Sequence, residues 1–439
     1  MAARCSRPVS SGHHESGGLH PLLLRGARRL CLTDGAVDRG SPEQPACPGG
    51  ISAHLGGRRC RQRNDLWFWS GFLPAGAPGA CRPSVLAVTV HHQRRSRLRD
   101  ALSDDVRGVF VTRDLASVRY LTGFSGSNAT VVIGTDEVHL VTDGRYREQA
   151  HHESPDVAAV IDRDVVGALR GLCTGREVAL DDRTPVGMAQ QLTEAGLAVR
   201  AVADPVAPLR MVKDTQELDA LSRAGGITAR ALEQVADTIA VGEREADIAR
   251  RLEAAFAEWG ADDRAFATIV ASGENSALPH HRAGDRPLTT GDLLVIDCGA
   301  KVDGYHADMT RTFVVGAEPN EWQHEMHSLV LQAQQAARDA VAPEVVAGDI
   351  DAAAREPITL AGFGEAFAHG TGHGVGLEIH EQPMLSARSS AVLPEHAVVT
   401  VEPGIYLPDR GGVRIEDTVV VAHAPQVLTE MQRGLTRVG

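Results

Sequence analysis

Short hydrophobic runs alternate with amphipathic stretches from about residue 90 to Pro208. This pattern predicts a helix at 94–102, a strand at 108–112, and a pair of strands at 129–133 and 138–142. Strands and helices continue to alternate in the remainder of the region. Such alternation is typical of a small α/β domain, which we expect to cover residues 85–208.

A second region begins at Leu209, just before a helix N-terminal signal in which a Thr or Asp N-cap precedes acidic residues of a first turn. Pro357 lies inside a later helical pattern, where it is expected to kink the helix or end it early. Helices combined with paired antiparallel strands predict an α+β domain over residues 209–439. The expected elements are helices at about 215–240, 244–259, 320–341 and 349–361, and strands at 293–297, 305–315, 398–402 and 417–422.

The first 84 residues follow neither pattern. They are rich in Gly, Pro, Arg and Cys, lack Lys, and carry 11 Arg against 5 acidic residues. Arg25 interrupts the apolar stretch at 21–24, so a secretory signal is not expected. We interpret residues 1–84 as a disordered or misassigned N-terminal extension, with a targeting peptide and a basic interaction arm as the alternatives.

Composition restricts the classes of function. Of the 439 residues, 43% are hydrophobic and 23% are charged, which fits a folded core. The net charge of −13 argues against a nucleic-acid partner. No apolar run reaches the roughly 18 residues of a membrane span, so no membrane association is expected. Five of the seven cysteines precede residue 82, so the body has no disulfide framework and a cytoplasmic location is expected.

Two pairs of acidic residues flank turns in the second region. Asp297 ends an apolar strand and Asp308 follows a turn expected at 302–304, so the hairpin would place the two carboxylates opposite each other. Glu402 and Glu416 flank a second hairpin in the same way. Facing carboxylates repel and are costly to bury. A bound cation removes this objection.

A glycine-rich segment at 370–376 contributes His373. Four carboxylates and one imidazole suit Mn, Fe, Co or Zn in a two-metal site. The segment also contains Gly-x-Gly, but it lacks the spacing and the lysine of a nucleotide-binding loop. Its glycines are therefore expected to let the backbone approach a ligand closely.

Five motifs contain the candidate ligands, namely Asp297, Gly304–Thr312, His369–Glu381, Val401–Tyr406 and Gly412–Asp417. In this order they resemble the motifs of the creatinase-like metallopeptidases, and among these aminopeptidase P and prolidase. The resemblance covers roughly residues 88–439. It implies a pita-bread catalytic domain preceded by a smaller α/β domain, and assembly as a homodimer or homotetramer.

The resemblance also implies a role for each candidate ligand. Asp297 would hold one metal ion, Asp308 and Glu416 would bridge two ions, and His373 and Glu402 would complete the second site. The expected ions are two divalent cations, most simply Mn²⁺, with Co²⁺ or Zn²⁺ as alternatives. Two cations would lower the pKa of a bound water that attacks the scissile carbonyl, and Glu402 could move its proton.

Three further residues match the family's motifs around the metals. His280 would orient the substrate, and His380 would donate to the developing oxyanion. Arg414 would fix the geometry of His380 or of the carboxylates. His281 is expected to be an ordinary loop residue. His369 and Tyr406 are weaker candidates, expected to line the pocket and pack.

The predicted function is a Xaa-Pro aminopeptidase, with Xaa-Pro dipeptidase (prolidase) as the alternative. Its partners would be peptides with proline at the second position. The choice between the two activities depends on how closed the pocket is. Less favoured are a methionine aminopeptidase-like peptidase, which shares the five ligands, and a non-catalytic peptide-binding relative, which would tend to lose them.

Overall fold

The computed structural model describes residues 89–102 and 108–439, so the extension predicted for residues 1–84 lies outside the described ranges. The described residues belong to one compact unit. In the part of the chain that is described, no helix is long and apolar enough to cross a membrane.

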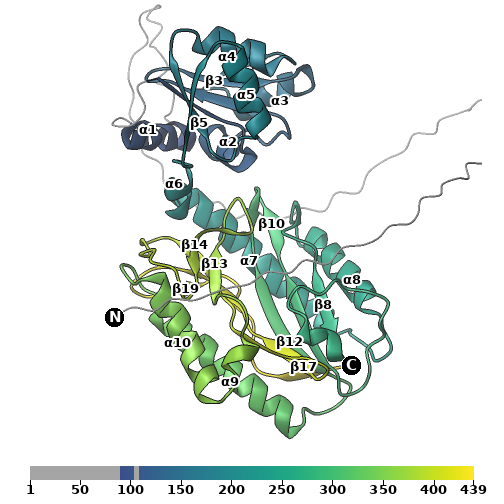
Figure 1. The fold of residues 1–439 in the computed structure, drawn as a ribbon. Helices are drawn as coiled ribbons and strands as arrows, with labels where there is room; N and C mark the ends of the chain where they lie inside the picture. The colour runs from purple at the N-terminus through teal and green to yellow at the C-terminus, as the bar shows by residue number, and fades with distance from the viewer. Residues whose placement is uncertain (1–88, 103–107) are drawn as a thin grey trace, which may run out of the picture. The chain divides into compact units, whose positions relative to one another are not determined.

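A six-stranded mixed sheet with the order β4-β3-β2-β1-β5-β6 organises residues 109–202 (Figure 1). Alternate residues of its central strand face two separate cores: Phe110 joins one, and Val109 and Val111 join the other. Helices therefore cover both faces, which explains the continuous apolar runs of the strands. The strands are β1 (Val109–Thr112), β2 (Thr130–Ile133), β3 (Val138–Thr142), β4 (Ala158–Ile161), β5 (Glu177–Asp181) and β6 (Ala198–Val202).

The helices of this sheet domain lie between its strands, as the alternating sequence pattern predicts. The predicted helix at 94–102 begins earlier, at Val90. Helices α2 and α4 each begin after an aspartate whose side chain caps the helix N-terminus. The helical elements are α1 (Val90–Leu102), α2 (Leu115–Thr122), η1 (Gly144–Tyr146), α3 (Arg147–Glu153), α4 (Val165–Cys173) and α5 (Val186–Glu194).

A short helix, α6 (Ala207–Met211), leads into the long helix α7 (Thr215–Ala236). Asp214 is the N-cap of α7, and its side chain and that of Glu217 form a reciprocal capping box. The predicted start of this helix is confirmed. Helix α8 (Glu245–Glu258) follows and packs beside α7 in the same hydrophobic core.

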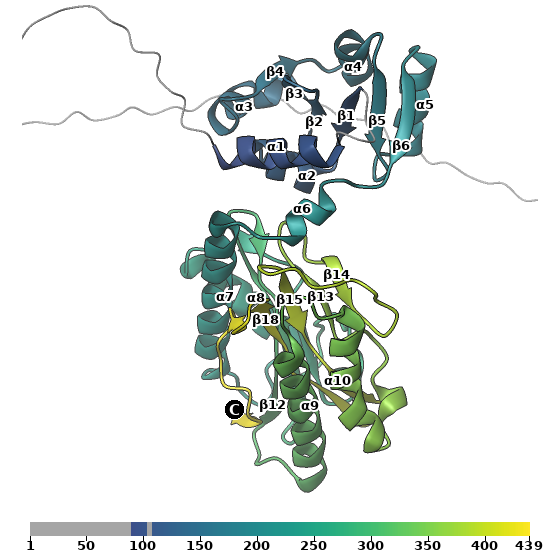
Figure 2. The same cartoon turned by 90° about the vertical axis from the view of Figure 1, so that its left-hand side faces the viewer.

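Two antiparallel-rich sheets with paired helices outside them form the rest of the chain (Figure 2). Helices α7 and α8 share a core with β8 (Ile269–Ser272), β9 (Leu293–Cys298) and β12 (Met309–Val315). Helices α9 (Glu321–Ala340) and α10 (Ala347–Leu360) share another with β15 (Val398–Val401), β17 (Gly411–Arg414) and β18 (Asp417–Val420). This is the pita-bread arrangement, so the predicted fold class is confirmed.

The strand orders of this region are β20-β12-β9-β8 and β14-β13-β15-β18-β19, with a three-stranded sheet β11-β10-β7 and a β16-β17 hairpin. The bounds are β7 (Asp263–Arg264), β8 (Ile269–Ser272), η2 (Gly273–Ala277), β9 (Leu293–Cys298), β10 (Ala300–Val302), β11 (Tyr305–His306), β12 (Met309–Val315), η3 (Gly364–Ala366), β13 (Gly372–Gly374), β14 (Glu381–Leu385), β15 (Val398–Val401), β16 (Gly404–Leu407), β17 (Gly411–Arg414), β18 (Asp417–Val420), β19 (Gln426–Val427) and β20 (Thr436–Val438).

The predicted strand at 305–315 is interrupted at its acidic residue. The hairpin turns at Asp303-Gly304, both with positive φ, and β9 then pairs with β12 so that Thr310 lies opposite Asp297. The prediction that Asp308 faces Asp297 directly is therefore wrong by two residues. The position of the turn sets this offset, because the pairing keeps one register from Val302–Tyr305 to Cys298–Met309 and is centred between Asp303 and Gly304, one residue later than predicted.

Pro357 does not end its helix, because α10 continues to Leu360. The proline occupies the last turn, and its carbonyl still accepts a hydrogen bond from the amide of Ala361. A proline near a helix end removes only one of the ladder's hydrogen bonds, so the remaining turn survives.

Candidate metal centre

The structure brings the predicted ligands together from five segments that are distant in sequence. Asp297 lies in β9 and Asp308 immediately precedes β12. His373 is the middle residue of β13, Glu402 follows β15, and Glu416 joins β17 to β18. The ends and junctions of strands from separate sheets thus meet at one place.

The register of the second hairpin agrees with the sequence prediction. Val401 pairs with Asp417 and Gly404 pairs with Arg414. Both pairings have the same register, so Glu402 and Glu416 lie across from each other where the two ladders join. Asp409, with φ of 62°, lies in the turn at the middle of this hairpin.

Three of the five side chains already approach one another as ligands would. Asp308, His373 and Glu416 each offer a ligand atom, and these atoms all lie within 4.8 Å of one another. The Nε2 atom of His373 is 3.7 Å from Oδ2 of Asp308 and 3.3 Å from Oε1 of Glu402. Side chains that bind one metal ion between them are spaced in this way.

The electrostatics of this cluster favour a bound positive charge. Burial raises the pKa of Asp308 well above its ordinary value, and the charges of Glu416 and Asp297 raise it further. Burial and the charges of Glu402 and Asp297 likewise raise the pKa of Glu416. Burial acts in the same direction on Glu402, but the hydrogen bond with His373 and the positive charges of His373, His369 and Arg414 together outweigh it and hold the pKa of Glu402 low. The site is short of positive charge.

Two buried oxygens in the cluster lack a partner among the described residues, namely Oδ1 of Asp297 and Oε1 of Glu416. A buried carboxylate oxygen without a hydrogen bond is costly. The other oxygens of the same groups are satisfied, since Asp297 Oδ2 accepts from Arg414 and Glu416 Oε2 accepts from the Thr310 hydroxyl. Together with the oxygen-rich donor set, this pattern fits a site for divalent cations.

Arg414 is buried and makes contact with several parts of the centre. Its guanidinium donates to Oδ2 of Asp297 at 2.7 Å, to the hydroxyl of Thr310 at 3.0 Å, and to the hydroxyl of Tyr406 at 2.9 Å. A longer bond of 3.4 Å reaches the carbonyl of Pro279. Arg414 therefore touches a carboxylate of the centre, as the second of its two predicted roles requires, whereas none of its hydrogen bonds goes to His380.

Tyr406 and His369 have a more specific arrangement than the packing role predicted for them. The hydroxyl of Tyr406 lies 2.9 Å from Nε2 of His369, so Asp297, Arg414, Tyr406 and His369 form one hydrogen-bonded chain. Burial lowers the pKa of His369, which favours its neutral form. The motif context gave these residues a place near the pocket, but only the fold shows the connection.

Sequence reasoning missed two residues of α10 that hold the glycine-rich segment. Asp351 is fully buried, and its Oδ1 accepts from both the amide and the hydroxyl of Thr371. Arg355 donates to Asp351 and to the carbonyls of Phe367 and His369. Their spacing of four residues on one helix face was a weak signal, because such pairs usually lie on the surface.

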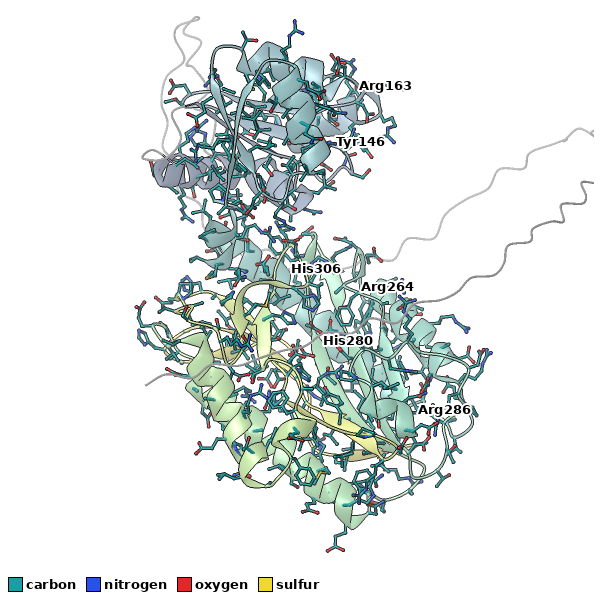
Figure 3. The ribbon with its side chains drawn as sticks, in the orientation of Figure 1. Tyr146, Arg163, Arg264, His280, Arg286 and His306 are labelled. Atoms are coloured by element: carbon teal, nitrogen blue, oxygen red, sulfur yellow. The ribbon has the colours of Figure 1, made fainter. Side chains whose placement is uncertain are left out.

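A cavity of about 490 Å³ opens onto the centre and contains both predicted substrate-binding histidines. His280 is exposed in it (Figure 3), and the His380 ring lies edge-on to the His373 ring at a centroid distance of 4.4 Å. Burial and the proximity of His373 lower the pKa of His380. The walls also carry apolar side chains, namely Phe266, Ile269, Pro279, Ile379 and Met384.

The pita-bread fold, with four carboxylates and an imidazole gathered beside a cavity, defines a class of metal-dependent hydrolases. Comparison with known families agrees with this class on both parts of the chain. Residues 94–212 match the Creatinase/Prolidase N-terminal domain, and residues 219–423 match metallopeptidase family M24.

Individual proteins of known sequence or structure are also similar to this chain. The chain is 44% identical over 237 residues to the Xaa-Pro dipeptidase of Pyrococcus furiosus, covering 54% of this chain and 68% of that protein. The structure of the Xaa-Pro dipeptidase from Bacillus anthracis is 34% identical with a TM-score of 0.76, covering 79% of this chain and all of that one. The structure of the X-Pro aminopeptidase from Thermotoga maritima is 37% identical with a TM-score of 0.74, covering 78% and 99%.

The chain belongs to metallopeptidase family M24. It is therefore a hydrolase of peptide bonds that depends on metal, and the resemblance to creatinase-like metallopeptidases is confirmed.

Proposed function

We propose that the protein is a Xaa-Pro dipeptidase, which hydrolyses dipeptides whose second residue is proline. The sequence alone favours Xaa-Pro aminopeptidase, with Xaa-Pro dipeptidase as the alternative. The names of the similar proteins support the second reading better, because relatives at 44% and 39% identity and several similar structures are called Xaa-Pro dipeptidase or prolidase. Xaa-Pro aminopeptidase is the alternative activity, and the name of the similar Thermotoga maritima structure supports it.

The observation that carries the metal-dependent hydrolysis in this proposal is the buried cluster of carboxylates, two of whose oxygens have no partner among the described residues. Asp297, Asp308 and Glu416, with His373 and Glu402, would hold two divalent cations, for which we propose Mn²⁺ ahead of Co²⁺ or Zn²⁺. When bound, the cations would supply Lewis-acid polarisation and a water of lowered pKa.

The protein side chains around the cations would bind and orient the peptide. His380 presents its ring to the cavity, beside His373, where it could donate to the oxygen of the scissile carbonyl as negative charge develops. Glu402 borders the same cavity and is held ionised by His373, so it could accept a proton at a carboxylate oxygen. His280, exposed on the cavity wall, would orient the substrate.

The size of the cavity agrees with a short peptide. A volume of about 490 Å³ lies in the lower part of the roughly 300–1,000 Å³ range of small-molecule sites. Its walls are largely apolar outside the metal centre, which suits a proline ring and an apolar first residue.

The test is a comparison of three peptides with the full-length chain loaded with Mn²⁺. The proposal predicts that a Xaa-Pro dipeptide is hydrolysed at a kcat/KM at least about tenfold above a Xaa-Pro-Yaa tripeptide. A preference for the tripeptide would support the aminopeptidase instead, and cleavage of a Met-Ala peptide alone would indicate a methionine aminopeptidase-like activity. Absence of hydrolysis of all three would support a non-catalytic peptide-binding protein.

We also propose that the chain assembles as a homodimer or homotetramer and that it is located in the cytoplasm. The predicted homodimer or homotetramer can be tested by light scattering of the purified chain. The predicted cytoplasmic location can be tested by cell fractionation.

A further inference from the structure

A buried carboxylate outside the metal centre collects hydrogen bonds from the segment that carries His280. Glu245, the first residue of α8, is completely buried, and no Lys or Arg of the described residues forms an ion pair with it. Its Oε1 accepts from the amide and hydroxyl of Ser272 and from the side chain of Asn275. Its Oε2 accepts from Nε2 of His281 at 2.8 Å and from the amide of Gly284.

All five of these donors belong to residues 272–284. The segment runs from the end of β8 through η2 toward β9, and the carboxylate binds its beginning, its middle and its end. The hydrogen bonds hold the pKa of Glu245 below its ordinary value even though burial acts to raise it. An ionised carboxylate with five donors is a strong local anchor.

His280 has no anchor of its own. Its side chain is exposed in the cavity, and among the described residues its ring makes no hydrogen bond. Its two chain neighbours are held instead: the carbonyl of Pro279 accepts from Arg414, and the ring of His281 is bonded to Glu245. Because His280 lies between two fixed residues, the direction of its side chain depends on them.

We propose that Glu245 and His281 are positioning residues for His280. They fix the backbone on its C-terminal side, so that the imidazole of His280 faces the cavity in the geometry that the substrate needs. The inference rests on the proposed function of His280 as a substrate-orienting group. It also gives His281, which sequence analysis treated as an ordinary loop residue, a defined role.

A purely structural role would give a different result in a double-mutant cycle. If His281 acts through His280, its loss matters only while His280 is present. If His281 merely stabilises the fold, its loss lowers activity by the same factor in either background.

The experiment measures kcat and KM of the Mn²⁺-loaded full chain for a Xaa-Pro dipeptide in His280→Ala, His281→Ala and the double variant. We expect His281→Ala to lower kcat/KM about tenfold, mainly through KM, and to have less than a twofold further effect in the His280→Ala background. His281→Gln keeps a donor near the position of Nε2 and is expected to recover most of the activity. His324→Asn, an exposed histidine of α9, is the control for loss of an imidazole.

Hydrogen exchange of the amides in residues 273–284 gives a second readout that does not need turnover. His281→Ala should accelerate exchange in this segment and leave α9 and α10 unchanged. Equal losses in both backgrounds, or unchanged exchange in the segment, would overturn the inference. If the parent protein cleaves no Xaa-Pro dipeptide, the proposed function fails, whereas the exchange measurement still decides whether Glu245 and His281 fix the segment.

Discussion

The guanidinium of Arg414 donates to Oδ2 of Asp297 at 2.7 Å, while Oδ1 of the same carboxylate is buried and has no partner in the part of the chain that the structure describes. One oxygen is thus occupied by a cation of the protein, and the other stays available to a metal ion. A side chain that contacts a ligand in this way orients it and tunes its charge. The pair therefore links the rigid hairpin β16–β17 to the metal centre.

Arg414→Lys should weaken both metal binding and turnover. Lysine keeps the charge, but it cannot reach Asp297, Thr310 and Tyr406 at once as the guanidinium does. We expect metal affinity or kcat/KM to fall roughly 10- to 100-fold, measured by Mn²⁺ titration and a dipeptide assay. Arg410→Lys, at an exposed position of the same hairpin, is the control. Unchanged affinity and rate would show that the contact does not orient Asp297.

Asp308→Asn should stabilise the metal-free protein and abolish its stabilisation by metal. The folded-state pKa of Asp308 lies above its ordinary value because burial and neighbouring acids oppose ionisation, so its charge costs stability at neutral pH. In EDTA we expect a melting temperature about 2 °C or more above the parent, and no rise on adding Mn²⁺. Asp409→Asn, in the exposed turn, is the matched control. A lower melting temperature in EDTA would contradict the electrostatic account.

Tyr406→Phe should break the hydrogen-bonded chain between Arg414 and His369. The variant keeps the ring but leaves buried polar groups without their partner. We expect a loss of about 1–3 kcal/mol in unfolding free energy, measured by urea denaturation, together with reduced turnover. Tyr146→Phe removes a hydroxyl whose hydrogen bond lies at an exposed position, so we expect a smaller loss in unfolding free energy. Equal costs for the two variants would argue against a special role for Tyr406.

Glu217→Gln should change how stability depends on pH. Burial raises the pKa of Glu217 to about 7 from 4.5, although Arg94 opposes the shift. The stability contributed by the protonated form is complete below pH 4.5 and is lost as the pH rises through about 7. Glutamine stays neutral, so the variant does not lose this stability as the pH rises. The free energy of unfolding of the variant minus that of the parent should therefore increase by about 2 kcal/mol between roughly pH 5 and pH 8.

Glutamine also suits this position of a capping box, and Arg94 keeps Asp214 as a partner at 2.8 Å. Glu233→Gln, on the exposed face of the same helix, controls for the loss of one charge. A stability difference that is flat across the range would contradict the raised pKa of Glu217.

The sequence predicted local features well where a local pattern determines them. The N-cap at Asp214 follows from residue chemistry alone, and the register that places Glu402 across from Glu416 follows from a regular hairpin around Asp409. Asp297 and Asp308 are different, because their hairpin turns at Asp303-Gly304, one residue later than predicted, and this moves the pairing by two residues. A pattern of strand residues does not fix the exact position of the turn that sets the register.

The contacts that hold the metal centre together could not be predicted from the sequence, because they join residues that are far apart in the chain. Arg414 and Asp297 are separated by 117 residues, and Asp351 of α10 is 20 residues from Thr371, which lies just before β13. The same holds for Glu245 and His281. Motifs indicate which residues are candidates for the chemistry, whereas the fold determines which residues hold them in place.

The most direct test of the whole account combines metal content and turnover in Asp297→Asn. The parent chain, stripped with EDTA and reloaded, should bind two Mn²⁺ per chain and hydrolyse a Xaa-Pro dipeptide. Asparagine removes the charge of Asp297 while keeping its size, so metal content should fall below two and kcat/KM should drop by roughly three orders of magnitude. A variant that retains both its metal and its turnover would contradict the assignment of this centre.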